Sequence, residues 1–218
     1  MALALFDLDN TLIAGDSDYE WGRWLVRNNR VDADYYARTN ERFYDDYKQG
    51  KLDIQAYLAF ALEPLAALEP SELQALHREF MTQVIAALWL PAAEQLLARH
   101  RAEGDQLVVI SATNRFVVEP ICRKLQVEEI IATEPEVRAG RYTGNVAGTP
   151  SYGDGKVIRL REWLQGRNQT LAGSYFYSDS HSDLPLLREV THPVAVDPDS
   201  ELRREAEQRG WPIISLRG

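Results

Sequence analysis

Short runs of consecutive apolar residues recur along the chain, and each leads into polar residues. The first run, 3–6, is followed directly by Asp7. An apolar run without alternation is typical of a strand that is buried on both faces, as in a parallel sheet. Runs of this kind predict five further strands, at 107–110, 129–133, 174–177, 193–196 and 212–215.

Segments with helical periodicity fill most of the gaps between these strands. They lie at 92–101, 117–125, 156–165, 184–190 and 202–209, whereas 141–147 reads as part of a hairpin. Strand alternating with helix predicts an α/β fold with a doubly wound, Rossmann-like parallel sheet. Because open sheets of this kind place their sites at the carboxyl ends of the strands, the polar residues there are the first candidates for function.

Residues 16–90 break the alternation. They contain no convincing buried strand and read as successive amphipathic helices. Ten of the 21 aromatic residues fall between Tyr19 and Phe60, and the segment holds 13 acidic against 8 basic residues. We therefore predict an all-helical cap domain at 16–90, inserted into a core domain formed by 1–15 and 91–218.

The composition narrows the class of protein. Apolar residues make up 45% of the 218 residues and charged residues 26%, which excludes a disordered or collagen-like chain. The formal net charge of −9, with no basic run, disfavours binding to nucleic acid or to an anionic membrane. No apolar stretch reaches the ~18 residues of a membrane helix, and the single cysteine, Cys122, fits a reducing compartment. We expect a cytoplasmic protein.

The strongest chemical signal is Asp7-x-Asp9-x-Thr11, directly after the first predicted strand. Two carboxylates with this spacing can share one pocket once the chain curls away from extended geometry. A calcium-binding loop is a rival interpretation, which we reject because the sixth position is Leu12 instead of glycine and the twelfth is Asp18 instead of glutamate.

Other strand ends carry complementary groups. Ser111 follows the second strand, Lys156 opens a predicted helix, and Asp179 and Asp183 follow a later strand. Phosphoryl transfer requires a nucleophile, a proton donor, a divalent cation, and positive groups for the phosphoryl oxygens. The acids, the lysine and the hydroxyl at this edge of the sheet supply that inventory.

With these motifs in this order, the chain resembles the phosphatase branch of the haloacid dehalogenase superfamily, and specifically its phosphoserine-phosphatase-like group. The resemblance covers nearly the whole chain, with a helical cap in the expected position. It implies that Asp7 is the nucleophile that forms an aspartyl-phosphate, and that Asp9 is first the general acid and then the base. It further implies that Thr11 and Ser111 bind the phosphoryl group, and that Lys156 holds nucleophile and phosphate together.

The same resemblance implies Mg²⁺ as the cofactor. Its ligands would be Asp7, Asp179 and the main-chain carbonyl of Asp9, with Asp183 supporting the metal directly or through water. A carboxylate and a phosphate repel each other unless cations lie between them, which agrees with these roles. An acid at position 9 favours hydrolysis of phosphomonoesters, because a weak alcohol leaving group needs a proton.

Two candidate substrate-binding residues have an equally good structural interpretation. Asn114 could bind phosphate or could cap the helix that follows it. Asp16 occupies the position where the phosphoserine-phosphatase group carries an acid that faces the substrate's amino group. It could equally cap the first helix of the cap domain.

The choice of phosphate ester depends on the cap. The Ser-Leu-Arg-type motif with which phosphoserine phosphatases grip a carboxylate is absent, and 37–42 is the nearest basic stretch. The runs 14–18 and 111–116 look more like a bacterial subgroup that includes histidinol-phosphatases, and an aromatic, acidic cap suits a cationic imidazole-amine.

We therefore predict a small-molecule phosphate ester as the partner, with hydrolysis of histidinol phosphate to histidinol. The alternatives are phosphoserine or another amino-alcohol phosphate, a phosphotransferase that uses the same intermediate, and a non-enzymatic phosphoacceptor. The expected assembly is a monomer or a homodimer.

Overall fold

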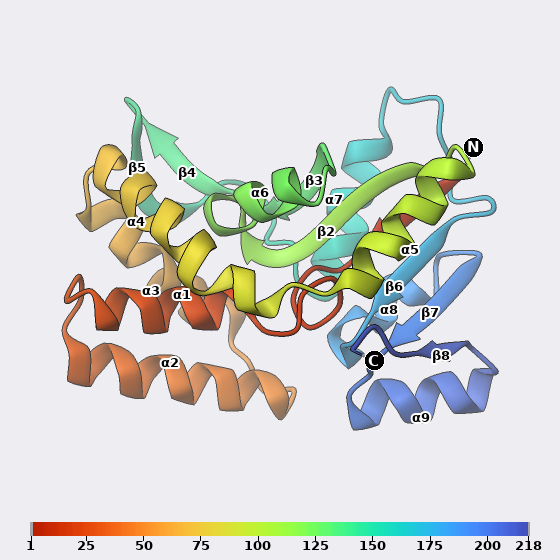
Figure 1. Cartoon of the computed structure of the whole chain (residues 1–218), viewed down its shortest axis with the longest axis horizontal. Helices are drawn as coiled ribbons and strands as arrows, with labels where there is room; N and C mark the ends of the chain where they lie inside the picture. The colour runs from red at the N-terminus through yellow and green to blue at the C-terminus, as the bar shows by residue number, and fades with distance from the viewer. Residues whose placement is uncertain (1, 218) are drawn as a thin grey trace.

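Six parallel strands form the central sheet of the molecule (Figure 1). The computed structural model describes residues 2–217. The strand order is β3-β2-β1-β6-β7-β8, so the chain reverses its direction of travel across the sheet between β1 and β6. The strands are β1 (Leu3–Phe6), β2 (Gln106–Asn114), β3 (Glu129–Thr133), β6 (Tyr175–Ser178), β7 (His192–Val196) and β8 (Ile213–Ile214). The predicted α/β fold and its six strands are confirmed.

Both faces of the sheet are covered by helices, which explains why the strand sequences are continuously apolar. In β1, Ala4 and Phe6 belong to one buried cluster, whereas Leu3 and Leu5 belong to the cluster on the opposite face. The first face carries α5 (Pro91–Ala102) and α6 (Arg115–Lys124). The second carries α7 (Asp154–Leu164), α8 (Leu184–Leu187) and α9 (Ser200–Arg209).

Between β1 and β2 the chain forms only helices, as the sequence predicts. Before α5 these are α1 (Ser17–Arg27), α2 (Ala33–Lys48), α3 (Ile54–Ala67), α4 (Pro70–Gln83) and the 3-10 helix η1 (Ile85–Leu88). The first three begin at an aspartate whose carboxylate accepts N–H groups of the first turn, namely Asp16, Asp32 and Asp53. In the described part of the chain, we find no helix with the length and apolar character needed to cross a membrane.

The two ends of the helical segment are paired with each other. The N–H of Ala14 donates to the carbonyl of Leu88 (2.8 Å), and Ile13 and Trp89 form an isolated antiparallel bridge. The chain therefore leaves and rejoins the sheet through two adjacent linkers beside the carboxyl end of β1. The hairpin predicted around 141–147 is confirmed as β4 (Pro135–Arg138) paired with β5 (Arg141–Val146), which packs on α3.

Aromatic side chains join the helical segment to the sheet domain. Trp21 of α1 packs edge-on against Phe80 of α4 and against Phe116 of α6, with ring centroids 5.2 and 5.5 Å apart. These contacts belong to one hydrophobic cluster that runs from the cap helices to the sheet. The division into domains at 15/16 and 90/91 stays a prediction.

This shared cluster makes the two parts of the chain depend on each other for stability. Replacing the fully buried Trp21 with alanine removes contacts to both, and we expect a loss of ~3–5 kcal/mol in the free energy of unfolding. Chemical denaturation followed by far-UV and near-UV circular dichroism measures this, with one transition for both signals. Two separate transitions, of which the variant shifts only one, would contradict a shared core.

Candidate active site

The loop after β1 turns back on itself immediately and gathers its polar side chains. The N–H groups of three successive residues, Thr11 to Ile13, all point to the carbonyl of Leu8 at 2.9–3.3 Å. Asn10 adopts a left-handed conformation with φ of 57°, which asparagine tolerates better than most residues. The turn places the hydroxyl of Thr11 3.3 Å from Oδ2 of Asp7.

A buried lysine joins two acids that are far apart in sequence. Nζ of Lys156 donates to Oδ1 of Asp7 and to Oδ2 of Asp183, both at 2.8 Å. The three residues are 2%, 7% and 1% exposed, so their charges interact with little screening by water. Lys156 reaches this position because α7 starts close to the preceding turn, where a Cβ on Gly155 would lie 2.0 Å from the carbonyl oxygen of Pro150.

Burial and the neighbouring charges shift the pKa values of this group. Burial raises the pKa of Asp7 to about 7, against the attraction of Lys156 and with the repulsion of Asp183 and Asp9. Burial alone would lower the pKa of Lys156, but Asp183 and Asp7 outweigh it and raise that pKa above its ordinary value. The lysine stays charged, and the site holds more negative charge than one ammonium group neutralises.

Asp179 joins the same group through Thr11. The threonine hydroxyl lies 3.2 Å from Oδ1 of Asp179 and accepts the N–H of that residue at 3.1 Å. Burial raises the pKa of Asp179 well above its usual value, and repulsion from Asp7 and Asp183 adds to the shift. Thr11 and Lys156 thus link Asp7, Asp179 and Asp183, and the assignment of these acids as metal ligands stays a prediction.

The oxygen donors of this site fit a hard divalent cation. Oδ1 of Asp183 is buried and has no hydrogen-bond partner among the described residues, although Oδ2 accepts from Lys156 and Ser178. An unpartnered buried carboxylate oxygen beside Asp7 and Asp179 is the donor set that Mg²⁺ prefers. The ligand oxygens of Asp7, Asp179 and Asp183 do not all lie within 4.8 Å of one another in this structure.

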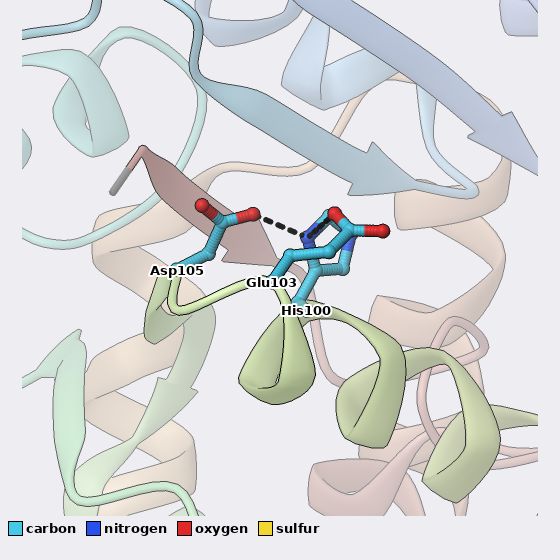
Figure 2. A group of neighbouring side chains, drawn as sticks. All are labelled: His100, Glu103 and Asp105. Atoms are coloured by element: carbon cyan, nitrogen blue, oxygen red, sulfur yellow. Dashed lines mark hydrogen bonds and ion pairs between the residues drawn. The ribbon is translucent and has the colours of Figure 1, made fainter.

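A second group of potential ligands lies beside the start of β2. Among residues 2–217, one trio of histidine and acidic side chains has ligand atoms all within 4.8 Å of one another, namely His100, Glu103 and Asp105 (Figure 2). Both ring nitrogens of His100 are engaged, since Nδ1 meets Asp105 and Nε2 meets the hydroxyl of Tyr177, each at 2.9 Å. Asp105 also accepts the N–H of Ala2. The trio ties α5 to the sheet.

The second acid of the first motif is held by groups from two other segments. Oδ2 of Asp9 accepts from the hydroxyls of Ser111 (3.3 Å) and Thr113 (2.9 Å), and Oδ1 accepts the N–H of Ser17 (2.6 Å). The contact with Ser111 confirms that β1 and β2 end side by side. Thr113 was not among the predicted residues. The one signal for it was that Thr113 lies two residues after Ser111, so that both side chains point to the same face of β2.

A cavity opens between these residues and the cap helices. It encloses ≈ 680 Å³ when the open solvent at its mouth is included. Asp7, Asp9, Lys156 and Asp183 lie at one end, and the cap contributes mainly aromatic residues, namely Tyr19, Phe43, Tyr44, Tyr47 and Tyr57. Among the described residues that line it, Lys156 is the only basic one.

The structure places the two ambiguous residues differently. Asn114 is buried, caps α6 by accepting the N–H of Val117 (3.3 Å), and is not part of the cavity wall. Asp16 does line the cavity, and its Oδ1 also caps α1 by accepting from Asp18 and Tyr19. Asn114 therefore serves the fold here, whereas Asp16 combines a cap with a place in the cavity.

Asp18 is a cavity residue that the sequence analysis missed. It is 7% exposed, and its carboxylate accepts from the hydroxyl of Tyr57 (2.6 Å) and the amide of Asn114 (3.2 Å). Burial raises its pKa to about 7, although the hydrogen bond from Tyr57 opposes the shift. Its position in the first turn of a helix gave no signal, because acidic residues are common there through their interaction with the helix dipole.

Metal binding can be measured through stability alone. Adding Mg²⁺ at 100 times its Kd to metal-free protein should raise the free energy of unfolding by ~2.7 kcal/mol. Asp179→Asn removes a ligand charge and should lose most of this gain in thermal denaturation. Asp105→Asn, in the trio of Figure 2, is the control and should keep the full gain; loss of the gain in this variant instead would move the metal to the other site.

The pKa of Asp18 predicts a pH-dependent cost of its burial. Because this carboxyl titrates near 4 when unfolded and near 7 when folded, the stability it confers falls as pH rises between these values. We expect Asp18→Asn to remove this pH-dependent loss. The difference in free energy of unfolding between the variant and the wild type should then grow in favour of the variant by ~2 kcal/mol from pH 5 to pH 8. Urea denaturation at both pH values measures it, and the exposed Asp32→Asn should track the wild type. If the free energy of unfolding depends on pH in the same way for Asp18→Asn and the wild type, burial does not shift the pKa of Asp18.

Comparison with known proteins supports the same family. The model of the haloacid dehalogenase-like hydrolases matches residues 4–188. A histidinol-phosphatase of Neisseria meningitidis is 48% identical over 99% of both chains. A phosphoserine phosphatase of Mycobacterium tuberculosis is 31% identical over 99% of this chain and 71% of its own.

Solved structures agree in fold. A protein of unknown function from Bordetella pertussis superposes with a TM-score of 0.93 at 45% identity, covering 99% of this chain and 98% of its own. A substrate-bound phosphoserine phosphatase superposes with a TM-score of 0.74 at 19% identity, covering 99% and 93%. The chain belongs to the haloacid dehalogenase-like hydrolases and is an enzyme of their phosphatase type, as its motifs and its cap predicted.

Proposed function

We propose that the protein is a Mg²⁺-dependent phosphomonoester hydrolase that works through an aspartyl-phosphate on Asp7, with histidinol phosphate as its ester. The observation that carries the reaction type is the buried ion pair of Asp7 with Lys156, which lines an acidic cavity together with Asp9. We further propose that residues 16–90 act as the cap domain over a core of 1–15 and 91–218.

In the first step a carboxylate oxygen of Asp7 attacks phosphorus. The new O–P bond forms as the bond between phosphorus and the ester oxygen breaks, and Asp9 gives its proton to the departing alkoxide. The hydroxyls of Ser111 and Thr113, which contact Asp9, hold its carboxyl at a fixed angle. The ammonium of Lys156, which lines the cavity, binds the phosphoryl oxygens, and the fully buried hydroxyls of Thr11 and Ser111 complete this group.

In the second step water releases the phosphate. Asp9, now deprotonated, takes a proton from the water, whose oxygen attacks phosphorus while the bond to Asp7 breaks. Asp7, Asp179, Asp183 and the carbonyl of Asp9 would hold Mg²⁺, which neutralises charge between carboxylate and phosphate when bound. Lys156 stays charged throughout because Asp7 and Asp183 both stabilise its ammonium group.

The cavity supports an ester with a cationic alcohol. Two acids, Asp16 and Asp18, line its cap side together with several aromatic rings, and neither makes an ion pair within residues 2–217. Carboxylates and aromatic faces both favour a protonated amine or imidazole. Histidinol phosphate carries both groups, and the 48%-identical relative from Neisseria meningitidis is named for this ester.

Phosphoserine is the alternative that shares the amino group. It also carries a carboxylate, and this needs a basic partner that the cavity wall lacks apart from Lys156, which already contacts two acids. A phosphotransferase with the same intermediate differs in its acceptor, and product formation with water alone separates the two. A monomer or homodimer in the cytoplasm remains our expectation.

The reaction and the ester are tested together on purified protein with Mg²⁺. We expect kcat/KM for histidinol phosphate to exceed that for phosphoserine and for p-nitrophenyl phosphate by at least about tenfold, a difference of ~1.4 kcal/mol in transition-state binding. Release of inorganic phosphate with water as the only acceptor measures it. Equal values for all three esters would refute the choice of ester but not the reaction.

The variant Asp7→Asn tests the reaction itself. The amide keeps the shape of the carboxyl but is too weak a nucleophile, so turnover should fall by about 1,000-fold or more on every ester. Circular dichroism should show an unchanged fold. Retention of activity by this folded variant would eliminate the covalent mechanism.

A further inference from the structure

Asp18 is a buried acid for which the protein supplies no positive partner. Both of its contacts are neutral donors, the hydroxyl of Tyr57 and the amide of Asn114. None of the ion pairs among residues 2–217 includes it, and Lys156 already lies between Asp7 and Asp183. A carboxylate at 7% exposure without a counter-ion is costly, and the rise of its pKa to about 7 reflects this.

The position of Asp18 makes it reachable from the cavity. It lies in the first turn of α1, where α3 and the start of α6 meet, and its side chain forms part of the cavity wall. The neighbouring wall is aromatic, with the rings of Tyr57 and Phe43 packed edge-on 5.5 Å apart. An acid against aromatic rings in an enclosed space is a suitable environment for a cation.

Asp16, the other acid on the cap side of the cavity, has fewer free oxygen atoms with which to bind a cation. Its Oδ1 is used to cap α1 through the N–H groups of Asp18 and Tyr19, which leaves one oxygen for a ligand. Asp18 has both oxygens held from the protein side by single hydrogen bonds, and a carboxylate has about four lone-pair sites. The hydrogen bonds from Tyr57 and Asn114 therefore fix the carboxylate without saturating it.

We infer that Asp18 is the specificity-determining residue of the cavity, and that its carboxylate binds the cationic nitrogen group on the alcohol part of the substrate. Tyr57 is a positioning residue that holds this carboxylate against the cavity. The inference rests on the proposed function, because it concerns the same cavity and the same ester. It adds which residue distinguishes a cationic ester from a neutral one.

The contacts of Asp18 separate it from the chemistry at the other end of the cavity. It makes no hydrogen bond to Asp7, Asp9 or Lys156, and its one electrostatic interaction with the acids at that end is repulsion from Asp9. Removing that charge should therefore raise KM for cationic esters, leave their kcat within about twofold, and leave neutral esters unaffected.

The test uses two esters that differ only in charge. O-Phosphoethanolamine and propyl phosphate have the same length, but only the first ends in an ammonium group. For the wild type we expect kcat/KM to favour the cationic ester by about 10- to 100-fold, the range for a hydrogen bond to a charged group. Asp18→Asn should reduce this preference to about twofold or less, almost wholly through KM.

Two further variants complete the experiment. Asp32→Asn, with the same charge change at an exposed cap of α2, is the matched control and should keep the full preference. Tyr57→Phe removes one hydrogen bond to Asp18 but no charge, so the preference should fall by about three- to tenfold. Asp18→Glu restores the charge and should recover part of the preference.

The outcomes separate the inference from the proposed ester. If Asp18→Asn keeps the wild-type preference for the cationic ester, or lowers kcat/KM for both esters equally, the role of Asp18 is refuted. If the wild type prefers phosphoethanolamine to propyl phosphate and Asp18→Asn abolishes this, the role stands even where histidinol phosphate proves a poor substrate. A wild type with no preference for charge in this pair overturns the role of Asp18 directly.

Discussion

The buried ion pairs of Lys156 with Asp7 and Asp183 are the constraint on which the rest of the site depends. Two ionised carboxylates buried side by side repel each other unless a cation lies between them, and removing one partner of such a group costs far more than forming it gains. This ion-pair group joins the end of β1, the start of α7 and the loop after β6. These segments meet between β1 and β6, where the order in which the chain adds strands to the sheet reverses.

Negative charge is in excess both in this group and in the cavity beside it. We expect a divalent metal ion to balance the first and a cationic group of the substrate to balance the second. At the phosphoryl end, Asp7, Asp179 and Asp183 exceed what Lys156 neutralises, which leaves a place for a divalent ion. At the cap end, Asp16 and Asp18 face aromatic rings with no basic residue beside them. The proposed ester, with a dianionic phosphate and a cationic alcohol, would complement both ends, with the proposed metal beside the phosphate.

The sequence predicted most accurately the strands of the sheet and the residues at their carboxyl ends. Strands enclosed by helices on both faces have to be continuously apolar, and parallel strands have to end at the same edge, so Asp7, Ser111 and Asp179 could be placed together. Asp18 and Thr113 could not, because the contacts of Asp18 depend on how α3 and the start of α6 pack against α1, and the contact of Thr113 depends on how the end of β2 lies beside Asp9. For Asn114 the structure shows the capping role that the sequence left open.

The central claim is that phosphate passes through a covalent bond to Asp7, and the stereochemical course at phosphorus tests it most directly. With an ester made chiral by the three oxygen isotopes and a suitable acceptor alcohol, transfer to Asp7 and then onward consists of two in-line displacements. The predicted result is net retention of configuration. Net inversion would show a single displacement and would contradict the role assigned to Asp7.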